Sequence, residues 1–153
     1  MKTPLATRPL GTPKILLVDD NPHGLVVRKA LLEEVGFAVQ IASNGEEGLD
    51  LFTASAFDVV VTDFRMPGMN GRELIQKIRK HNPNARIILL SGFVEPLGLT
   101  EQTTGANVVL AKNAKEATQL VRSVRRLLKQ TTPRKPPGSQ MSASRAPYRV
   151  KDR

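Results

Sequence analysis

Five short apolar runs, separated by segments with helical periodicity, occupy the middle of the chain. KILLVDD (14–20), FDVVVTD (57–63) and ARIILLSG (85–92) are nearly continuous, as is typical of parallel strands buried on both faces. FAVQIA (37–42) alternates apolar and polar residues, which indicates a strand with one wetter face, and NVVLAK (107–112) is the fifth run. The alternation predicts an α/β fold of βα units around a parallel sheet.

Caps and breakers predict the first two helices. Asn21 can cap a helix whose first turn contains Pro22 and which stops at Gly36. In SNGEEGLDLF, Asn44 and Glu47 stand at the spacing of a capping box, so a second helix is expected to begin there.

Apolar periodicity predicts two more helices. GRELIQKIRK places three apolar residues on one face: Leu74, Ile75 and Ile78. The last helix is predicted to open with a capping box of Asn113 and Glu116. Its apolar stripe consists of Leu120, Val121, Val124, Leu127 and Leu128. Between the fourth and fifth runs, FVEPLGLTEQTTGA (93–106) is rich in poor helix formers, so any helix there is expected to be short or mobile.

Length and composition favour one domain without disulfides. A chain of 153 residues has room for a single core of ordinary size. The absence of cysteine excludes disulfides and cysteine-ligated metals. No apolar run approaches the roughly 18 residues needed to span a bilayer. MKTPLATRPLGTP, at the start, lacks the apolar core of a signal peptide. We therefore expect a soluble, cytoplasmic protein.

The net charge of +9 is concentrated near the ends of the chain. Residues 14–130 contain fifteen Lys/Arg against thirteen Asp/Glu, whereas residues 131–153 contain six Lys/Arg and only Asp152. The predicted organisation is an N-terminal extension (1–13), one domain (14–130) and a basic, Pro/Ser-rich disordered tail (131–153). Weak contact of the tail with nucleic acid or an acidic surface remains an alternative to the favoured interpretation, a solvated tail without a specific partner.

Polar residues stand where the predicted strands end. Asp19 and Asp20 end the first strand and Asp63 the third, while Ser91 ends the fourth and Lys112 the fifth. In an open parallel sheet, ligands bind outside the carboxyl ends of the strands. Three carboxylates gathered there repel one another unless a cation lies among them.

An all-oxygen site of this kind suits Mg²⁺, with Mn²⁺ as the alternative. Asp63 could then attack phosphorus, because carboxylates form acyl-phosphate intermediates. Lys112 and Ser91 would supply a positive charge and a hydrogen-bond donor to the phosphoryl oxygens.

LLVDDNP, VVVTDFRMPGMNG, IILLSG and VLAK, in this order and spacing, resemble the receiver domain (CheY-like) of two-component response regulators. The resemblance covers about residues 14–130. It implies a flavodoxin-like, doubly wound (βα)₅ fold with strand order 2-1-3-4-5. It also implies transfer of a phosphoryl group from the phosphohistidine of a histidine kinase or phosphotransfer protein.

Carried over by position, the resemblance implies that Asp63 is the phosphoacceptor. Asp20 and Asp63 would bind Mg²⁺ directly, Asp19 mainly through water, and the backbone carbonyl of Arg65 would be a further ligand. Two more residues match the hydroxyl switch residue and the lysine of the family: Ser91 and Lys112.

Two positions depart from the family pattern. Val109 stands where many receivers have an aromatic residue that changes rotamer on phosphorylation. Asn113 follows Lys112 where a proline with a cis bond is usual, so the bond is either trans or strained. His23 is interpreted as a surface residue, and the side chain of Arg65 either pairs with phosphate or is solvated.

Other function classes remain open. A phosphatase of the haloacid-dehalogenase type requires Asp-x-Asp, but Arg65 occupies the last position. A flavin or nucleotide module is disfavoured because VDDNPHG places two acids where a phosphate loop would lie. The main alternatives are a phosphorylation-independent binding module with a receiver fold and a receiver fragment of a hybrid histidine kinase.

The expected output is protein–protein contact. The chain is not expected to be a classical enzyme, although it would catalyse its own aspartyl phosphorylation and dephosphorylation. Twenty-three tail residues cannot build a DNA-binding domain, so a downstream protein target is expected. The resemblance also suggests a homodimer through the face of the fourth helix, fifth strand and fifth helix.

Overall fold

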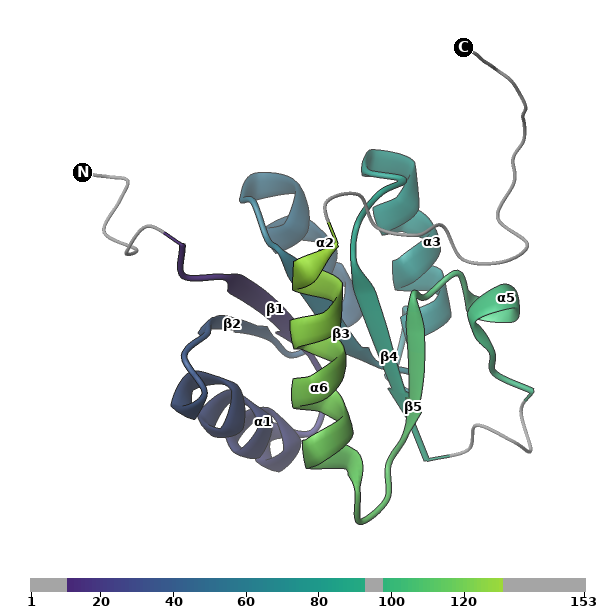
Figure 1. Cartoon of the computed structure of the whole chain (residues 1–153). Helices are drawn as coiled ribbons and strands as arrows, with labels where there is room; N and C mark the ends of the chain where they lie inside the picture. The colour runs from purple at the N-terminus through teal and green to yellow at the C-terminus, as the bar shows by residue number, and fades with distance from the viewer. Residues whose placement is uncertain (1–10, 93–97, 131–153) are drawn as a thin grey trace, which may run out of the picture.

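The computed structural model describes residues 11–92 and 98–130, which form a five-stranded parallel sheet. The order is β2-β1-β3-β4-β5, and every pair is parallel (Figure 1). The strands are β1 (Lys14–Val18), β2 (Ala38–Ala42), β3 (Val59–Asp63), β4 (Ile87–Ser91) and β5 (Val108–Ala111). The predicted fold class and strand order are confirmed.

Helices cover both faces of the sheet. They are α1 (Pro22–Glu34), α2 (Gly45–Ala54), α3 (Gly71–His81), α5 (Glu101–Thr104) and α6 (Glu116–Lys129). α1 and α6 lie on one face and α2 and α3 on the other, with α5 against α3 (Figure 1). Within the described part of the chain, no helix combines the length and apolar character required to cross a bilayer.

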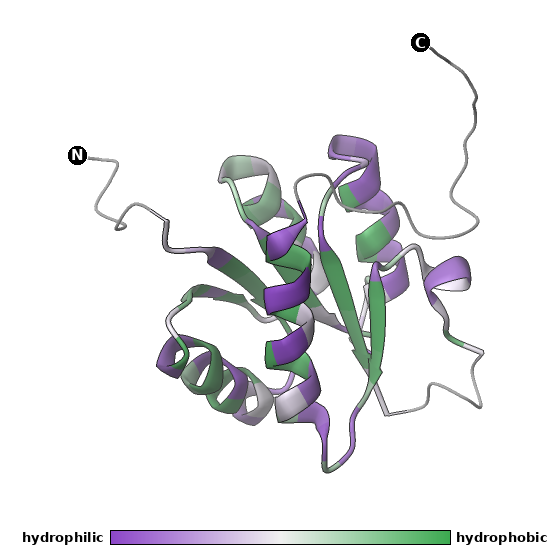
Figure 2. Cartoon of the chain, in the orientation of Figure 1, coloured by the Kyte–Doolittle hydropathy of each residue, from purple (hydrophilic) through white to green (hydrophobic). Residues whose placement is uncertain are grey.

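The sheet lies between two apolar layers because successive strand residues point to opposite faces. Ile15 and Leu17 of β1 belong to the layer beneath α1 and α6, while Leu16 and Val18 belong to the layer beneath α2 and α3. β3 and β4 are buried along their whole length, which explains their continuous apolar sequences. α3 and α6 are apolar towards the sheet and polar outwards (Figure 2). α1 differs, because it also exposes Val26 and Val27 to solvent.

The first two helices begin where the sequence predicts. The Asn21 side chain accepts hydrogen bonds from the backbone N–H groups of His23 and Gly24, and the Asn44 side chain accepts one from Glu47. The expected capping box at Asn44 is incomplete, because the Glu47 carboxylate instead accepts from Ser43, at 2.7 Å from its backbone nitrogen. A full capping box occurs where none was predicted, between Asn70 and Glu73 of α3.

The predicted capping box at the start of α6 is wrong. The Asn113 side chain accepts from the Lys115 backbone nitrogen, and no side chain caps the helix. The Glu116 carboxylate points away from its own backbone and binds Arg28 of α1. The Glu116 carboxylate accepts two hydrogen bonds from a charged guanidinium, whereas a capping box would give it one bond from a neutral backbone N–H, so the tertiary partner prevails.

In the described part of the segment before β5, residues 98–106, the helix α5 has four residues, which agrees with the weak helical sequence there. Residues 93–97 lie outside the described residues, as do residues 1–10 of the expected N-terminal extension and the whole expected tail, 131–153.

Candidate functional site: an acidic cluster at the carboxyl edge of the sheet

Three carboxylates meet where β1 and β3 end. Asp63 is the last residue of β3 and is 5% exposed; Asp19 directly follows β1 and is 2% exposed. Asp20 is exposed to solvent. One oxygen from each of the three lies within 4.8 Å of the others. Hard oxygen donors of this number and sign are those that Mg²⁺ prefers, so the residues fit the expected ion.

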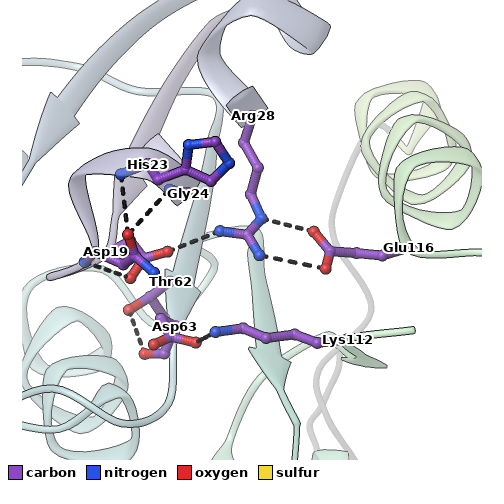
Figure 3. A network of polar contacts seen from close by, with 9 residues as sticks. Asp19, His23, Gly24, Arg28, Thr62, Asp63, Lys112 and Glu116 are labelled. Carbon is purple, nitrogen blue, oxygen red and sulfur yellow. Dashed lines mark hydrogen bonds and ion pairs between the residues drawn. The ribbon is translucent and has the colours of Figure 1, made fainter. Parts of the chain in front are cut away.

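Lys112 brings a positive charge to the same cluster from the end of β5. Its backbone nitrogen donates to the Ser91 carbonyl at 3.0 Å, which holds the residue beside the end of β4. Its Nζ forms an ion pair with Asp63 Oδ1, and the two side chains point towards each other (Figure 3). The Lys112–Asn113 peptide is trans, because no bond among the described residues is cis.

Burial dominates the protonation of Asp63. Desolvation raises the pKa of this carboxyl above its ordinary value, and the hydrogen bond and charge of Lys112 offset this only in part. The negative charge of Asp19 acts in the same direction as desolvation. Asp63 is therefore a carboxylate for which a further cation would be strongly favourable.

Ser91 and Arg65 lie on the segments that flank this cluster. Ser91 is the last residue of β4 and is 2% exposed, one position beyond Leu90, which pairs with Asp63 across the ladder. Arg65 is exposed in the loop after β3. The next residue, Met66, is buried in the apolar layer beneath α2 and α3, so it anchors this loop as well as shaping the turn.

Gly71 sets the course of the chain after Asp63. Its nitrogen donates to the Phe64 carbonyl at 2.8 Å, which closes the loop between β3 and α3. A Cβ at this position would crowd the carbonyl oxygen of Asp63 and would lie 2.9 Å from Leu89 Cδ1. The absent side chain thus allows α3 to begin directly against the end of β3.

Arg28 and Glu116 belong to the site although sequence reasoning missed both roles. Arg28 Nη1 donates to Asp19 Oδ2 at 2.7 Å, and Arg28 Nε donates to Glu116 Oε2 at 2.6 Å (Figure 3). Burial lowers the pKa of Arg28, but the Glu116 hydrogen bond and the charges of Glu116, Asp19 and Asp63 outweigh this and raise it, so the guanidinium stays charged. The sequence signal was an arginine two helical turns after the paired acids, four residues from Gly24.

An open cavity of about 440 Å³ adjoins the cluster on the side of α1 and α6. Its walls include Asp19, Arg28, Lys112 and Glu116, and also the exposed His23. Val109, at the position where an aromatic residue was expected, packs partly buried against the layer beneath α2 and α3, and its nitrogen donates to Glu101 Oε2 at 3.2 Å.

The family model of the response regulator receiver domain matches residues 15–125. A solved structure of the response regulator TrrA from Thermotoga maritima, in complex with Mg²⁺-BeF, is 33% identical with a TM-score of 0.70, covering 76% of this chain and all of that one. The receiver domain of a sensor histidine kinase from Pseudomonas aeruginosa, with a magnesium ion in its active-site cleft, is 26% identical with a TM-score of 0.71, covering 78% and 100% of the two chains.

Curated relatives include whole kinases and shorter regulators. The sensor histidine kinase GacS of Pseudomonas protegens is 41% identical over 68 residues, which are 44% of this chain and 7% of that protein. A response regulator receiver protein of Anaeromyxobacter is 37% identical over 81 residues, 53% of this chain and 34% of that protein. The chain thus spans only a small part of these relatives. It belongs to the family of response regulator receiver domains, homologous to those of response regulators and of hybrid histidine kinases.

Proposed function

We propose that this domain accepts a phosphoryl group on Asp63 from the phosphohistidine of a histidine kinase or phosphotransfer protein in a two-component phosphorelay. The observation that carries the proposal is the buried carboxylate of Asp63, paired with Lys112 and lying within reach of two further acids. A strand-end aspartate alone would be an ordinary cap or turn residue. A buried aspartate together with a lysine and two further carboxylates is suited to phosphoryl transfer.

In the transfer step, a carboxylate oxygen of Asp63 forms a bond to phosphorus while the phosphorus–nitrogen bond to histidine breaks. The electron pair leaves with the imidazole, which takes up a proton. Lys112 stabilises the negative charge of the phosphoryl oxygens, and Ser91 donates a hydrogen bond to them.

Mg²⁺, or Mn²⁺ in its place, would be held by Asp20 and Asp63, by Asp19 mainly through water, and by the backbone carbonyl of Arg65. When bound, the ion neutralises the charge that builds up between the carboxylate and the phosphoryl group. Asp19 accepts from Arg28 on one oxygen and from the Asn21 nitrogen on the other, and these contacts favour its indirect role. The structure of TrrA in complex with Mg²⁺-BeF supports a magnesium site in this domain by homology.

Intact-mass spectrometry after incubation with acetyl phosphate tests the proposal. The native chain is expected to gain one phosphoryl mass only when Mg²⁺ is present, and Asp63→Asn is expected to gain none. Asp50→Asn, which removes an exposed carboxylate from α2, is the matched control and should behave as the native chain does. A native chain that stays unmodified, or an Asp63→Asn variant that is still modified, would contradict the proposal.

A second candidate is a phosphorylation-independent binding module, which Val109 favours because the aromatic part of the family relay is missing. In that case the folded chain would remain unmodified in the same experiment. Either function would act by contact with a downstream protein. Either function is also compatible with a receiver domain inside a hybrid histidine kinase, as the similarity to GacS suggests. A homodimer through α5, β5 and α6 remains a prediction.

A further inference from the structure

We propose that Arg28 is an internal counter-cation that competes with the divalent cation for the acidic cluster, and that Glu116 sets the strength of this competition. The inference rests on the proposed function, because it concerns the same metal site. It assigns a positioning role to two residues outside the set of strand-end residues.

The contacts form a continuous chain from the cluster to α6. Arg28 Nη1 lies 2.7 Å from Asp19 Oδ2, and the other side of the guanidinium meets both Glu116 oxygens, with Nε at 2.6 Å from Oε2 and Nη2 at 3.3 Å from Oε1 (Figure 3). The Arg28 side chain is 11% exposed and that of Glu116 18%. One cation is therefore shared between a carboxylate of the cluster and a carboxylate outside it.

Gly24 makes this arrangement sterically accessible. Side chains of a helix lean towards its N-terminus, so Arg28 reaches back over the residue four positions earlier. A Cβ at Gly24 would lie 2.7 Å from Asp19 Oδ2 and 2.8 Å from Arg28 Nη1. Any larger residue there would push the guanidinium and the carboxylate apart.

The charges predict the sign of each effect. A divalent cation entering the cluster is repelled by the Arg28 guanidinium and has to share Asp19 with it. Glu116 offsets part of that positive charge. Removing the charge of Arg28 should therefore strengthen metal binding, whereas removing the charge of Glu116 should weaken it. A purely structural clasp between α1 and α6 predicts something else, because either change breaks the same contact and both would alter the site in the same direction.

Mg²⁺ affinity of the full chain, measured by titration of backbone amide NMR shifts at fixed ionic strength, tests the inference. Arg28→Gln is expected to lower the dissociation constant for Mg²⁺ about tenfold, and Glu116→Gln is expected to raise it about threefold. Effects of this size are typical of partly screened charges that lie a few ångströms apart. Lys29→Gln is the matched control. It removes the same charge from the next residue of α1, where Lys29 forms an exposed pair with Glu33, and should leave the affinity unchanged.

The amide spectra without metal show whether each variant is folded, and Arg28→Lys, which keeps the charge, supplies a second check with expected affinity near that of the native chain. The inference would be overturned if the Mg²⁺ dissociation constants of Arg28→Gln and Glu116→Gln changed in the same direction, or if neither changed. The proposed function would still stand in that case, provided that the native chain binds Mg²⁺. If neither the native chain nor Arg28→Gln binds Mg²⁺, the inference and the proposed function are both overturned. Binding gained only in Arg28→Gln would support the counter-cation.

Discussion

Asp63 is the residue at which stability and reactivity conflict. Its carboxylate is 5% exposed, and desolvation raises its pKa despite the ion pair with Lys112. In the absence of a divalent cation, the ionised form therefore destabilises the folded chain. Under the proposed function, the same property would favour the binding of a metal ion beside this carboxylate.

Replacing Asp63 by Asn should stabilise the metal-free chain in a pH-dependent way. Because the folded-state pKa is raised, the folded chain binds more protons than the unfolded chain above the ordinary pKa of 3.8, and stability falls as the pH rises through this window. Asp63→Asn removes this loss, so its stability advantage over the native chain should grow as the pH rises above 3.8. The difference in the free energy of unfolding between Asp63→Asn and the native chain is measured by urea unfolding in EDTA, monitored by circular dichroism at several pH values.

Asp50→Asn, which removes an exposed carboxylate, is the control for that series. An advantage of Asp63→Asn that is constant across the pH series would contradict the assignment of the cost to ionisation.

At the scale of elements, the connection from β3 to α3 determines where Asp63 lies. The loop is closed by the bond from the Gly71 nitrogen to the Phe64 carbonyl and anchored by the buried Met66. α3 then begins with the capping box of Asn70 and Glu73. The strand end is thus fixed by a helix start that tolerates no side chain at its first residue.

Gly71→Ala should destabilise the chain by about 1–3 kcal/mol, the cost of overpacking a filled site. The added methyl group would meet Leu89 and the backbone of Asp63. Gly92→Ala is the comparison, because none of the described residues lies within 4 Å of a Cβ there, and it should cost less than about 0.5 kcal/mol. Thermal unfolding of both variants decides the point, and equal costs would contradict the close-packing argument.

At the scale of the whole molecule, both faces of the sheet contribute to the site. α1 and α6 supply the Arg28–Glu116 contact, while α3 supports the loop after β3. The end of α6 is in turn tied to the sheet, because Arg86 Nε donates to the Leu127 carbonyl at 2.9 Å and Leu127 is buried. The site therefore depends on the chain through the end of α6.

We propose residues 14–130 as the folding unit, which predicts two outcomes of truncation. Removing residues 131–153 should change the free energy of unfolding by less than about 0.5 kcal/mol, because their sequence contains few apolar residues that a core could bury. Ending the chain before Leu127 should cost more than about 2 kcal/mol, through the lost buried side chain and the lost acceptor for Arg86. Urea unfolding of the two truncated chains measures these free energies. A large loss of stability on removal of residues 131–153 would show that the folding unit extends beyond residue 130.

The sequence alone was sufficient for the sheet and for the positions of the strand-end residues. Buried parallel strands need continuous apolar runs, and their carboxyl ends must meet at one edge, so Asp19, Asp63 and Lys112 could be brought together without coordinates. The helix caps at Asn21 and Asn44 could also be predicted from the sequence, because a cap depends on residues only a few positions away.

The tertiary structure decided the contacts between residues far apart in the chain. Glu116 has the spacing of a local capping residue, yet it binds Arg28, 88 positions away. The only sequence signal for Arg28 was its distance from the paired acids and from Gly24. The spacing of residues in the sequence predicts which hydrogen bonds can form between near neighbours along the chain. The choice between a local backbone partner and a distant guanidinium depends on which charges the packed helices bring within reach, and only the folded chain fixes that.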